Sequence, residues 1–349
     1  MTSSSPIDSL LSPARFNRDQ LRAEMLGHKI LSSHQGNLAA WAEKIRDRNV
    51  LVGVPDDRGV ELNHGFVGAS AGPDAFRNAF YRLYDARSDT GEWAGDSWID
   101  VGDLLLQPSI AETHAALADV VQFLLSHHAR RVHVIGGGHD FSFGSYLGHA
   151  RSCTGVLPII NFDAHFDLRA VDQGLINSGT PFRRVIESLG EHIAGGRALL
   201  EVGIQRERNP QSLWDYAQMH GVSVAEYTGA SDPWIFHRMP GSPVCSLREQ
   251  TTLWLEHWLS VADTSGHFHL SIDLDVFHTS AALGTSASTS FGVPVESLWP
   301  CMEDVLSRKI CRVVDVAELC PVRDVQSQTA RLAAAAVFRG SISRNALSR

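Results

Sequence analysis

Short apolar runs alternate along the chain with longer amphipathic stretches. Eight runs have the length and character of buried strands, and they begin at residues 50, 97, 131, 155, 198, 221, 267 and 310. Between them, residues 71–86, with Pro73 in the first turn, and residues 111–129 carry apolar side chains three and four positions apart, which predicts helices. This alternation predicts a parallel sheet covered on both faces. An open, doubly wound sheet and a closed eight-stranded barrel share the pattern, so strand counting leaves both open.

The sequence shows no internal repeat and no Pro- or Gly-rich linker. We therefore expect one domain over residues 1–349, with a catalytic core at about 50–340 and an N-terminal extension at 1–49. The first 30 or so residues, and residues 227–246 with their Gly, Pro and Ser, are expected to be surface excursions.

Composition and charge narrow the class of protein. Hydrophobic residues make up 44% of the 349, enough for a large core, and the net charge is -9 with no long basic run, which argues against nucleic acid as a partner. Neither a signal peptide nor a run of about 18 apolar residues is present, which predicts a cytoplasmic protein without a membrane partner. The five widely spaced cysteines suggest neither a disulfide framework nor a zinc clip.

Metal-capable side chains follow three of the predicted strands. Ligands bind beyond the carboxyl ends of parallel strands, and residues two apart on a strand share a face. A single histidine at such a place is more often structural, but here three strands carry acids or histidines at the same end. The six residues are His139, Asp163, His165, Asp167, Asp273 and Asp275.

Four carboxylates and two imidazoles near one point predict bound cations. Such carboxylates repel one another and resist burial unless positive charge compensates them, and two divalent ions would supply it. The set is mostly hard oxygen without thiolate, which favours Mn²⁺, although zinc, cobalt and nickel also bind such ligands. A pair of ions activates water and polarises the group that water attacks, so the pattern predicts a hydrolase.

The motifs GGGHD, NFDAHFD and SIDLDVF together resemble the three metal signatures of the ureohydrolase family, and GASAGPDAFR and AELCP resemble its flanking motifs. The resemblance covers roughly residues 50–340. It implies a three-layer α/β/α fold around an eight-stranded, mainly parallel sheet, two Mn²⁺ ions per chain held by the six residues above, and a homo-oligomer. It also implies that Glu318 grips the cationic guanidinium or amidinium of a small-molecule substrate.

Two further segments resemble the formimidoylglutamase branch of this family. Where arginase and agmatinase have a catalytic histidine, the chain reads NSGTPFRR, with Ser178 as the candidate catalytic residue. The segment GIQRERNP, residues 203–210, carries arginines where arginases have acids, which suits a substrate with two carboxylates. The candidate substrate-binding residues are Arg169, Arg183, Arg206, Arg208 and Asn209.

The resemblance implies hydrolysis of N-formimidoyl-L-glutamate to L-glutamate and formamide, a step of histidine degradation. The chain departs from the formimidoylglutamase pattern at Asp140, at Phe66 and in LGTSA, residues 283–287. These departures leave a guanidino-acid hydrolase or an agmatinase-like enzyme that releases urea as an alternative. A catalytically silent homologue is the alternative of a different class, and the intact ligand set argues against it.

Overall fold

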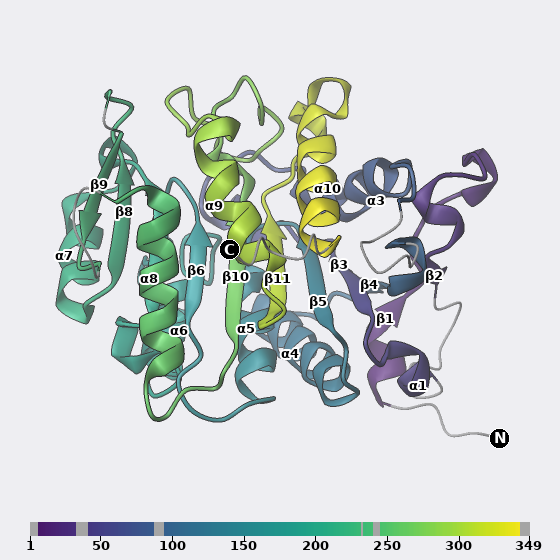
Figure 1. Ribbon diagram of the computed structural model, residues 1–349, viewed down its shortest axis with the longest axis horizontal. Helices are drawn as coiled ribbons and strands as arrows, with labels where there is room; N and C mark the ends of the chain where they lie inside the picture. Colours follow the sequence, from purple (N-terminus) through teal and green to yellow (C-terminus); the bar gives the residue numbers. More distant parts are fainter. Residues whose placement is uncertain (1–5, 33–40, 87–93, 232, 240–244, 343–349) are drawn as a thin grey trace.

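Eight parallel strands form the centre of one open sheet (Figure 1). The computed structural model describes residues 6–32, 41–86, 94–231, 233–239 and 245–342. Each predicted strand is confirmed, and in spatial order they run β4-β3-β5-β11-β10-β6-β7-β8. Because both edges of the sheet stay open, the closed barrel is excluded. The strands are β3 Asn49–Val54, β4 Trp98–Leu104, β5 Arg131–Gly136, β6 Ile159–Phe162, β7 Leu199–Ile204, β8 Ser223–Tyr227, β10 Phe268–Asp273 and β11 Cys311–Ala317.

Segments expected to be surface excursions extend the sheet at both edges. Near the N-terminus, β1 (Leu11–Ser12) pairs antiparallel with β4, and β2 (Leu31–Ser32) pairs with β4 in parallel. At the other edge, β9 (Trp234–His237) pairs antiparallel with β8. Leu26, between β1 and β2, is fully buried. β1, β2 and β9 are partly exposed, so these segments do lie at the surface, but edge pairing and the burial of residues such as Leu26 attach them to the sheet.

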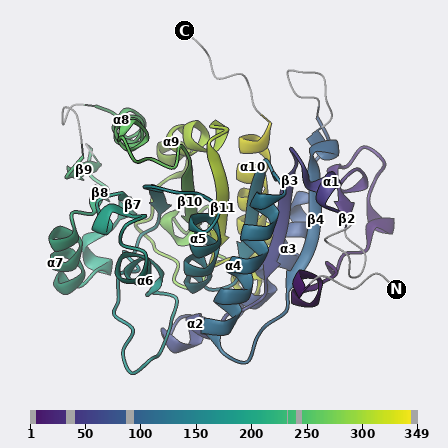
Figure 2. The same ribbon diagram turned by 90° about the horizontal axis from the view of Figure 1, so that it is seen from below.

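Helices cover both faces of the sheet, which confirms the three-layer α/β/α fold. Figure 2 shows α8 and α9 on one side of the sheet and α5 and α6 on the other. The first layer contains α3 Gly72–Phe80, α8 Leu247–Ser260, α9 Val295–Ser307 and α10 Gln328–Ser341. The second contains α4 Ile110–Ser126, α5 Ser142–Ala150, α6 Pro181–Ser188 and α7 Gln211–His220. Two short helices, α1 Ala42–Ile45 and α2 Arg58–Leu62, flank β3.

Alternation along each strand explains why the sheet needs two helical layers. In β3, Val50, Val52 and Val54 pack in the cluster that contains α4, whereas Leu51 packs in the cluster that contains α3. Both sets are buried, so the strand reads as a continuous apolar run. The start of α4 is fixed by a capping box between Ser109 and Glu112.

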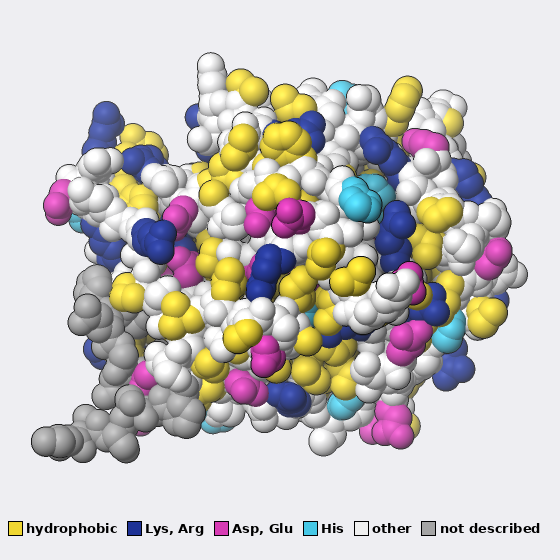
Figure 3. All heavy atoms as spheres, turned by 180° about the vertical axis from the view of Figure 1, so that it is seen from behind, with side chains coloured by type: hydrophobic (Ala, Val, Ile, Leu, Met, Phe, Trp, Pro, Cys, Tyr) yellow, Lys and Arg dark blue, Asp and Glu magenta, His cyan; other side chains and the backbone are white. Residues whose placement is uncertain are grey.

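One face of the molecule carries charges of both signs. On the face seen in Figure 3, Lys and Arg side chains are interspersed with Asp and Glu, and neither sign gathers into one large patch. No helix in the described ranges has both the length and the apolar character needed to cross a membrane. All five cysteines are free, and Cys301, Cys311 and Cys320 are buried.

One buried histidine in the core should make stability depend on pH. His133 on β5 is fully buried beside the Trp98 ring, with 4.6 Å between ring centroids. Neither of its ring nitrogens has a hydrogen-bond partner among the described residues. Burial, helped by the positive charge of Arg131, holds the pKa of His133 well below its usual value. The folded protein therefore keeps this imidazole neutral under conditions in which the unfolded chain binds a proton.

We expect the free energy of unfolding to fall as pH decreases below about 6.5, because there the unfolded state binds more protons than the folded state. His133 should contribute about 1.4 kcal/mol to this fall per pH unit. Urea unfolding at pH 7.5 and pH 5.5, followed by tryptophan fluorescence, would measure it. In His133→Leu, the free energy of unfolding should differ between the two pH values by about 1.4 kcal/mol less than in wild type. His257→Gln, at an exposed position on α8, should behave as wild type. An unchanged difference in His133→Leu would contradict this expectation.

Candidate metal centre

The polar residues predicted from the sequence follow four adjacent strands at the centre of the sheet. The order β5-β11-β10-β6 places the carboxyl ends of these strands side by side. His139 begins a 3-10 helix just after β5, Asp163 directly follows β6, and Asp273 is the last residue of β10. Because the four strands are parallel, these side chains meet at the carboxyl ends of the strands, in the middle of the sheet.

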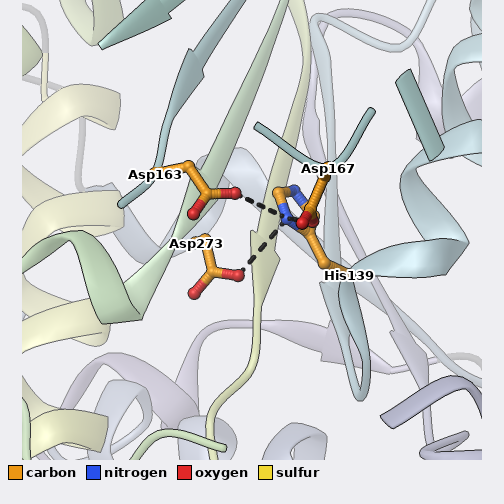
Figure 4. A group of neighbouring side chains, drawn as sticks. All are labelled: His139, Asp163, Asp167 and Asp273. Atoms are coloured by element: carbon orange, nitrogen blue, oxygen red, sulfur yellow. Dashed lines mark ion pairs between the residues drawn. The ribbon is translucent and has the colours of Figure 1, made fainter. Parts of the chain in front are cut away.

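The first group of ligand atoms surrounds one ring nitrogen of His139. Its Nδ1 lies 2.9 Å from Asp167 Oδ2, 3.2 Å from Asp163 Oδ2 and 3.3 Å from Asp273 Oδ2. Figure 4 shows the three carboxylates arranged around this imidazole. All four side chains are buried.

A second group shares Asp163 with the first. His165 Nδ1 lies 3.1 Å from Asp275 Oδ2 and 3.6 Å from the other oxygen of Asp163, Oδ1. The ligand atoms within each group lie within 4.8 Å of one another. The structure thus brings all six predicted ligands together in two groups, with Asp163 common to both.

The donor atoms of this cluster fit divalent cations. A single N–H of His139 can serve only one of the three carboxylates around it, and Nδ1 makes no well-directed hydrogen bond in the described part of the chain. Burial, with repulsion from Asp163, raises the pKa of Asp167 to about 6, and burial with repulsion from Asp275 raises the pKa of Asp273 well above its usual value. Cations between these oxygens would remove the repulsion, and oxygen with imidazole nitrogen suits Mn²⁺.

Ser271 orients the imidazole of His139. The other ring nitrogen, Nε2, lies 2.7 Å from Ser271 Oγ, so it can donate to the hydroxyl and leave Nδ1 facing the carboxylates. Sequence reasoning missed this residue. The signal was present, since Ser271 lies two positions before Asp273 on β10 and therefore points to the same face of the sheet.

Glu318 lies directly after β11, beside the metal ligands. Its Oε1 accepts a hydrogen bond from the backbone N–H of His139 at 2.8 Å, whereas Oε2 has no partner among the described residues. Burial raises the pKa of Glu318 to about 8, although Ser286 and the His139 N–H oppose the shift. A cation facing Oε2 would favour the ionised form. One oxygen is therefore anchored by the backbone, and the residue itself lines the pocket above the cluster.

A pocket of about 640 Å³ opens over the cluster. Its lining includes four of the six ligands, His165, Asp167, Asp273 and Asp275, together with Glu318. Arg169, Ser178, Arg208 and Asn209, which were predicted from the sequence, also line it, as do Asn63, His64 and Phe66. Residues from distant parts of the chain therefore share one cavity with the candidate metal ligands.

The other predicted residues differ in how free their side chains are. Asn209 uses its amide to brace the backbone, accepting from Phe166 N–H and donating to Ala164 and Gln205 carbonyls. Arg183 pairs with Glu187 on the exposed side of α6, at 2.7 Å. Neither Arg183 nor Arg206 is among the residues that line the pocket.

Arg206 is held away from the pocket by its own contacts. Its guanidinium pairs with Glu226 at 2.9 Å and lies over the Trp214 ring at 3.7 Å. By contrast, Arg208, two residues later in the same 3-10 helix, donates to the backbone carbonyl of Ser288 at 3.3 Å and makes no ion pair within the described ranges. The arginine-rich segment thus sends one of its two guanidinium groups toward the pocket.

A second and larger hollow, of about 790 Å³, lies at the opposite ends of the strands. Its lining includes Val156, Arg197 and Gly221, which precede β6, β7 and β8. None of the six predicted metal ligands is among its lining residues. Because ligands of parallel sheets bind at the carboxyl ends, the smaller pocket is the candidate active site.

The open parallel sheet and the buried His/Asp cluster at its carboxyl edge define the class of protein. A sequence model of the Arginase family matches residues 47–235 and 245–341. The chain belongs to the arginase family.

Within this family, the chain is similar to several formimidoylglutamases. The chain is 34% identical over 305 residues to a formimidoylglutamase of Rhodococcus opacus (strain B4), covering 83% of this chain and 84% of that protein. Its fold is similar to that of formimidoylglutamase from Bacillus subtilis, with a TM-score of 0.72 and 21% identity over 94% of this chain and 93% of the other. It is also similar to formiminoglutamase from Trypanosoma cruzi, solved with Mn²⁺, with a TM-score of 0.70 and 24% identity over 86% and 94% of the two chains.

Proposed function

We propose that this protein is a formimidoylglutamase, which hydrolyses N-formimidoyl-L-glutamate to L-glutamate and formamide. The observation that carries the proposal is one pocket that joins a buried His/Asp cluster, the carboxylate of Glu318 and the guanidinium-bearing residues Arg169 and Arg208. In a substrate that is an amidine with two carboxylates, the reacting carbon would lie beside the cluster, the amidinium would face Glu318, and the carboxylates would face the arginines. The relatives at about 34% identity carry the same activity in their names.

We assign the metal role to two Mn²⁺ ions. His139, Asp163, Asp167 and Asp273 would hold the first, and Asp163, His165 and Asp275 would hold the second. When bound, such ions activate water and polarise the carbon that it attacks. The observed donor set, with four carboxylates and no thiolate, supports a hard cation.

The chain's own residues position the substrate. Oε2 of Glu318 holds the cationic amidinium, which places its carbon beside the His/Asp cluster. The arginines at the rim pair with the two carboxylates. In the reaction, the bond between the amidine carbon and the glutamate nitrogen breaks, water supplies the oxygen of formamide, and the two protons of that water pass to the glutamate nitrogen, which leaves as an ammonium group.

Parallel assays would test the substrate. Purified, manganese-loaded protein should be incubated separately with N-formimidoyl-L-glutamate, 4-guanidinobutyrate, agmatine and arginine, and release of formamide, urea and amine measured. We expect turnover of the formimidoyl compound alone. Turnover of a guanidino compound only would replace the proposal by a urea-releasing member of the family. No turnover, with less than one tightly bound metal per chain, would indicate a silent homologue.

The two arginines of residues 206–208 offer a matched pair of variants. Arg208→Ala should raise the Michaelis constant for formimidoylglutamate by about 10- to 150-fold, because a charge-assisted contact worth roughly 1.5–3 kcal/mol is lost. Arg206→Ala should leave it nearly unchanged, since Arg206 pairs with Glu226 outside the pocket lining. Steady-state kinetics with metal analysis would measure both variants. Equal effects would contradict the placement of the carboxylate contact on Arg208.

The cytoplasmic location and the homo-oligomeric state stay predictions from the sequence. Size-exclusion chromatography with light scattering would determine the oligomeric state.

A further inference from the structure

One corner of the pocket is built from two loops that share a single backbone carbonyl. The carbonyl of Gly59, in α2, accepts hydrogen bonds from the backbone N–H of Asn63 at 3.1 Å and of Ser178 at 3.0 Å. The two residues are 115 positions apart in the sequence, yet this shared acceptor fixes their backbones relative to each other. Their side chains both line the pocket.

Gly179 brings Arg169 into the same corner. A Cβ atom added at Gly179 would lie 2.8 Å from Arg169 Cδ and 3.3 Å from Asn63 Nδ2, so a larger residue there would force these side chains to shift. The backbone N–H of Arg169 donates to the Gly179 carbonyl at 2.8 Å. The hydroxyl of Ser178 and the side chain of Arg169 are thus placed on either side of one small residue.

The hydrogen bond between the two side chains determines what the serine can do. The amide Nδ2 of Asn63 donates to Ser178 Oγ at 3.0 Å. An amide nitrogen carries no acceptor, so the hydroxyl hydrogen of Ser178 cannot be used in this contact. It remains available for an acceptor elsewhere, and Ser178 is a buried residue that lines the pocket.

We propose that Asn63 is a positioning residue that makes Ser178 a hydrogen-bond donor to a substrate carboxylate, which Arg169 holds at the same time. This inference rests on the proposed function, and it assigns one of the two carboxylates of the substrate to a subsite. It gives Ser178, which occupies the place of the family's catalytic histidine, a role in binding. A neutral donor beside a guanidinium suits a carboxylate, which can accept from both.

Alanine at position 178 tests the donor itself. Ser178→Ala should raise both the Michaelis constant for formimidoylglutamate and the inhibition constant of the product L-glutamate, which has the same two carboxylates, by about tenfold. The turnover number and the Mn²⁺ content should stay close to wild type. A fall in turnover number with both constants unchanged would overturn the proposal, because it would place Ser178 in the chemical step.

Reversing the polarity of the contact tests Asn63. In Asn63→Asp, the hydroxyl of Ser178 should donate to the new carboxylate and be lost to the substrate. The added negative charge also repels an anionic ligand, so the same change must be made in the Ser178→Ala background, where only that charge effect remains. We expect Asn63→Asp to weaken glutamate binding several-fold more when Ser178 is present. Equal effects in the two backgrounds would overturn the positioning role.

Direct calorimetric titration of L-glutamate into the manganese-loaded variants makes this test independent of turnover. If the wild-type protein binds L-glutamate and the variants behave as expected, the subsite stands even where the amidine substrate differs from formimidoylglutamate. If the protein turns over formimidoylglutamate but Ser178→Ala binds glutamate as tightly as wild type, the proposed function stands and the subsite is wrong.

Discussion

Asp163→Ala should remove tightly bound metal and reduce turnover by on the order of 10³-fold or more. Asp163 contributes Oδ2 to one group of ligand atoms and Oδ1 to the other, and its side chain is fully buried. Both groups therefore lose a ligand in a single substitution. Metal content by plasma emission spectrometry and steady-state kinetics at saturating substrate would measure the two losses, which should coincide.

A nearby acid provides the control. Asp172 is exposed in the loop that follows the ligands, and Asp172→Ala should keep both metal and activity. Wild-type protein should also lose thermal stability on addition of EDTA, because ions that bind only the folded state stabilise it, whereas Asp163→Ala should respond little. Full metal content in Asp163→Ala would contradict the assignment of a shared ligand.

Glu318→Gln should reduce kcat/KM by about 10²- to 10³-fold while the metal stays bound. The amide oxygen of the new glutamine can still accept the hydrogen bond from the backbone N–H of His139, so this contact is preserved. The other atom becomes an N–H donor in place of Oε2, which has no hydrogen-bond partner among the described residues, and a donor cannot hold a cationic amidinium. The loss should therefore appear in the kinetics and leave the cluster intact.

Glu207 is the matched control for this substitution. It also lines the pocket but is exposed, so Glu207→Gln should change kcat/KM little. Comparison of metal content and kinetics separates the roles of the two kinds of acid, since Asp163→Ala should lose metal and Glu318→Gln should keep it. Loss of metal from Glu318→Gln would indicate that this carboxylate supports the cluster and does not hold the substrate.

Much of the fold, and the six side chains that gather in the buried cluster, could be predicted from the sequence. Strands buried on both faces are apolar throughout, and this pattern is local, so the eight central strands were found near their observed bounds. The ligands were found for a similar reason. Asp163 and His165, like Asp273 and Asp275, lie two positions apart where a strand ends, and His139 follows another strand after a run of glycines. The chemistry of these side chains at this spacing pointed to metal.

Only the tertiary structure decided which distant residues meet. The crossover connections place β11 and β10 between β5 and β6, and this order brings His139, Glu318 and Asp163 to one edge of the sheet. Irregular segments have no period from which the direction of a side chain can be predicted, so the sequence does not distinguish Arg206 from Arg208. In the structure, Arg206 packs on Trp214, whereas Arg208 lines the pocket. The contact between Asn63 and Ser178 joins residues 115 positions apart. Strands, helices and the candidate metal ligands can be read from the sequence because they depend on local spacing, whereas the shape of the substrate pocket depends on long-range packing.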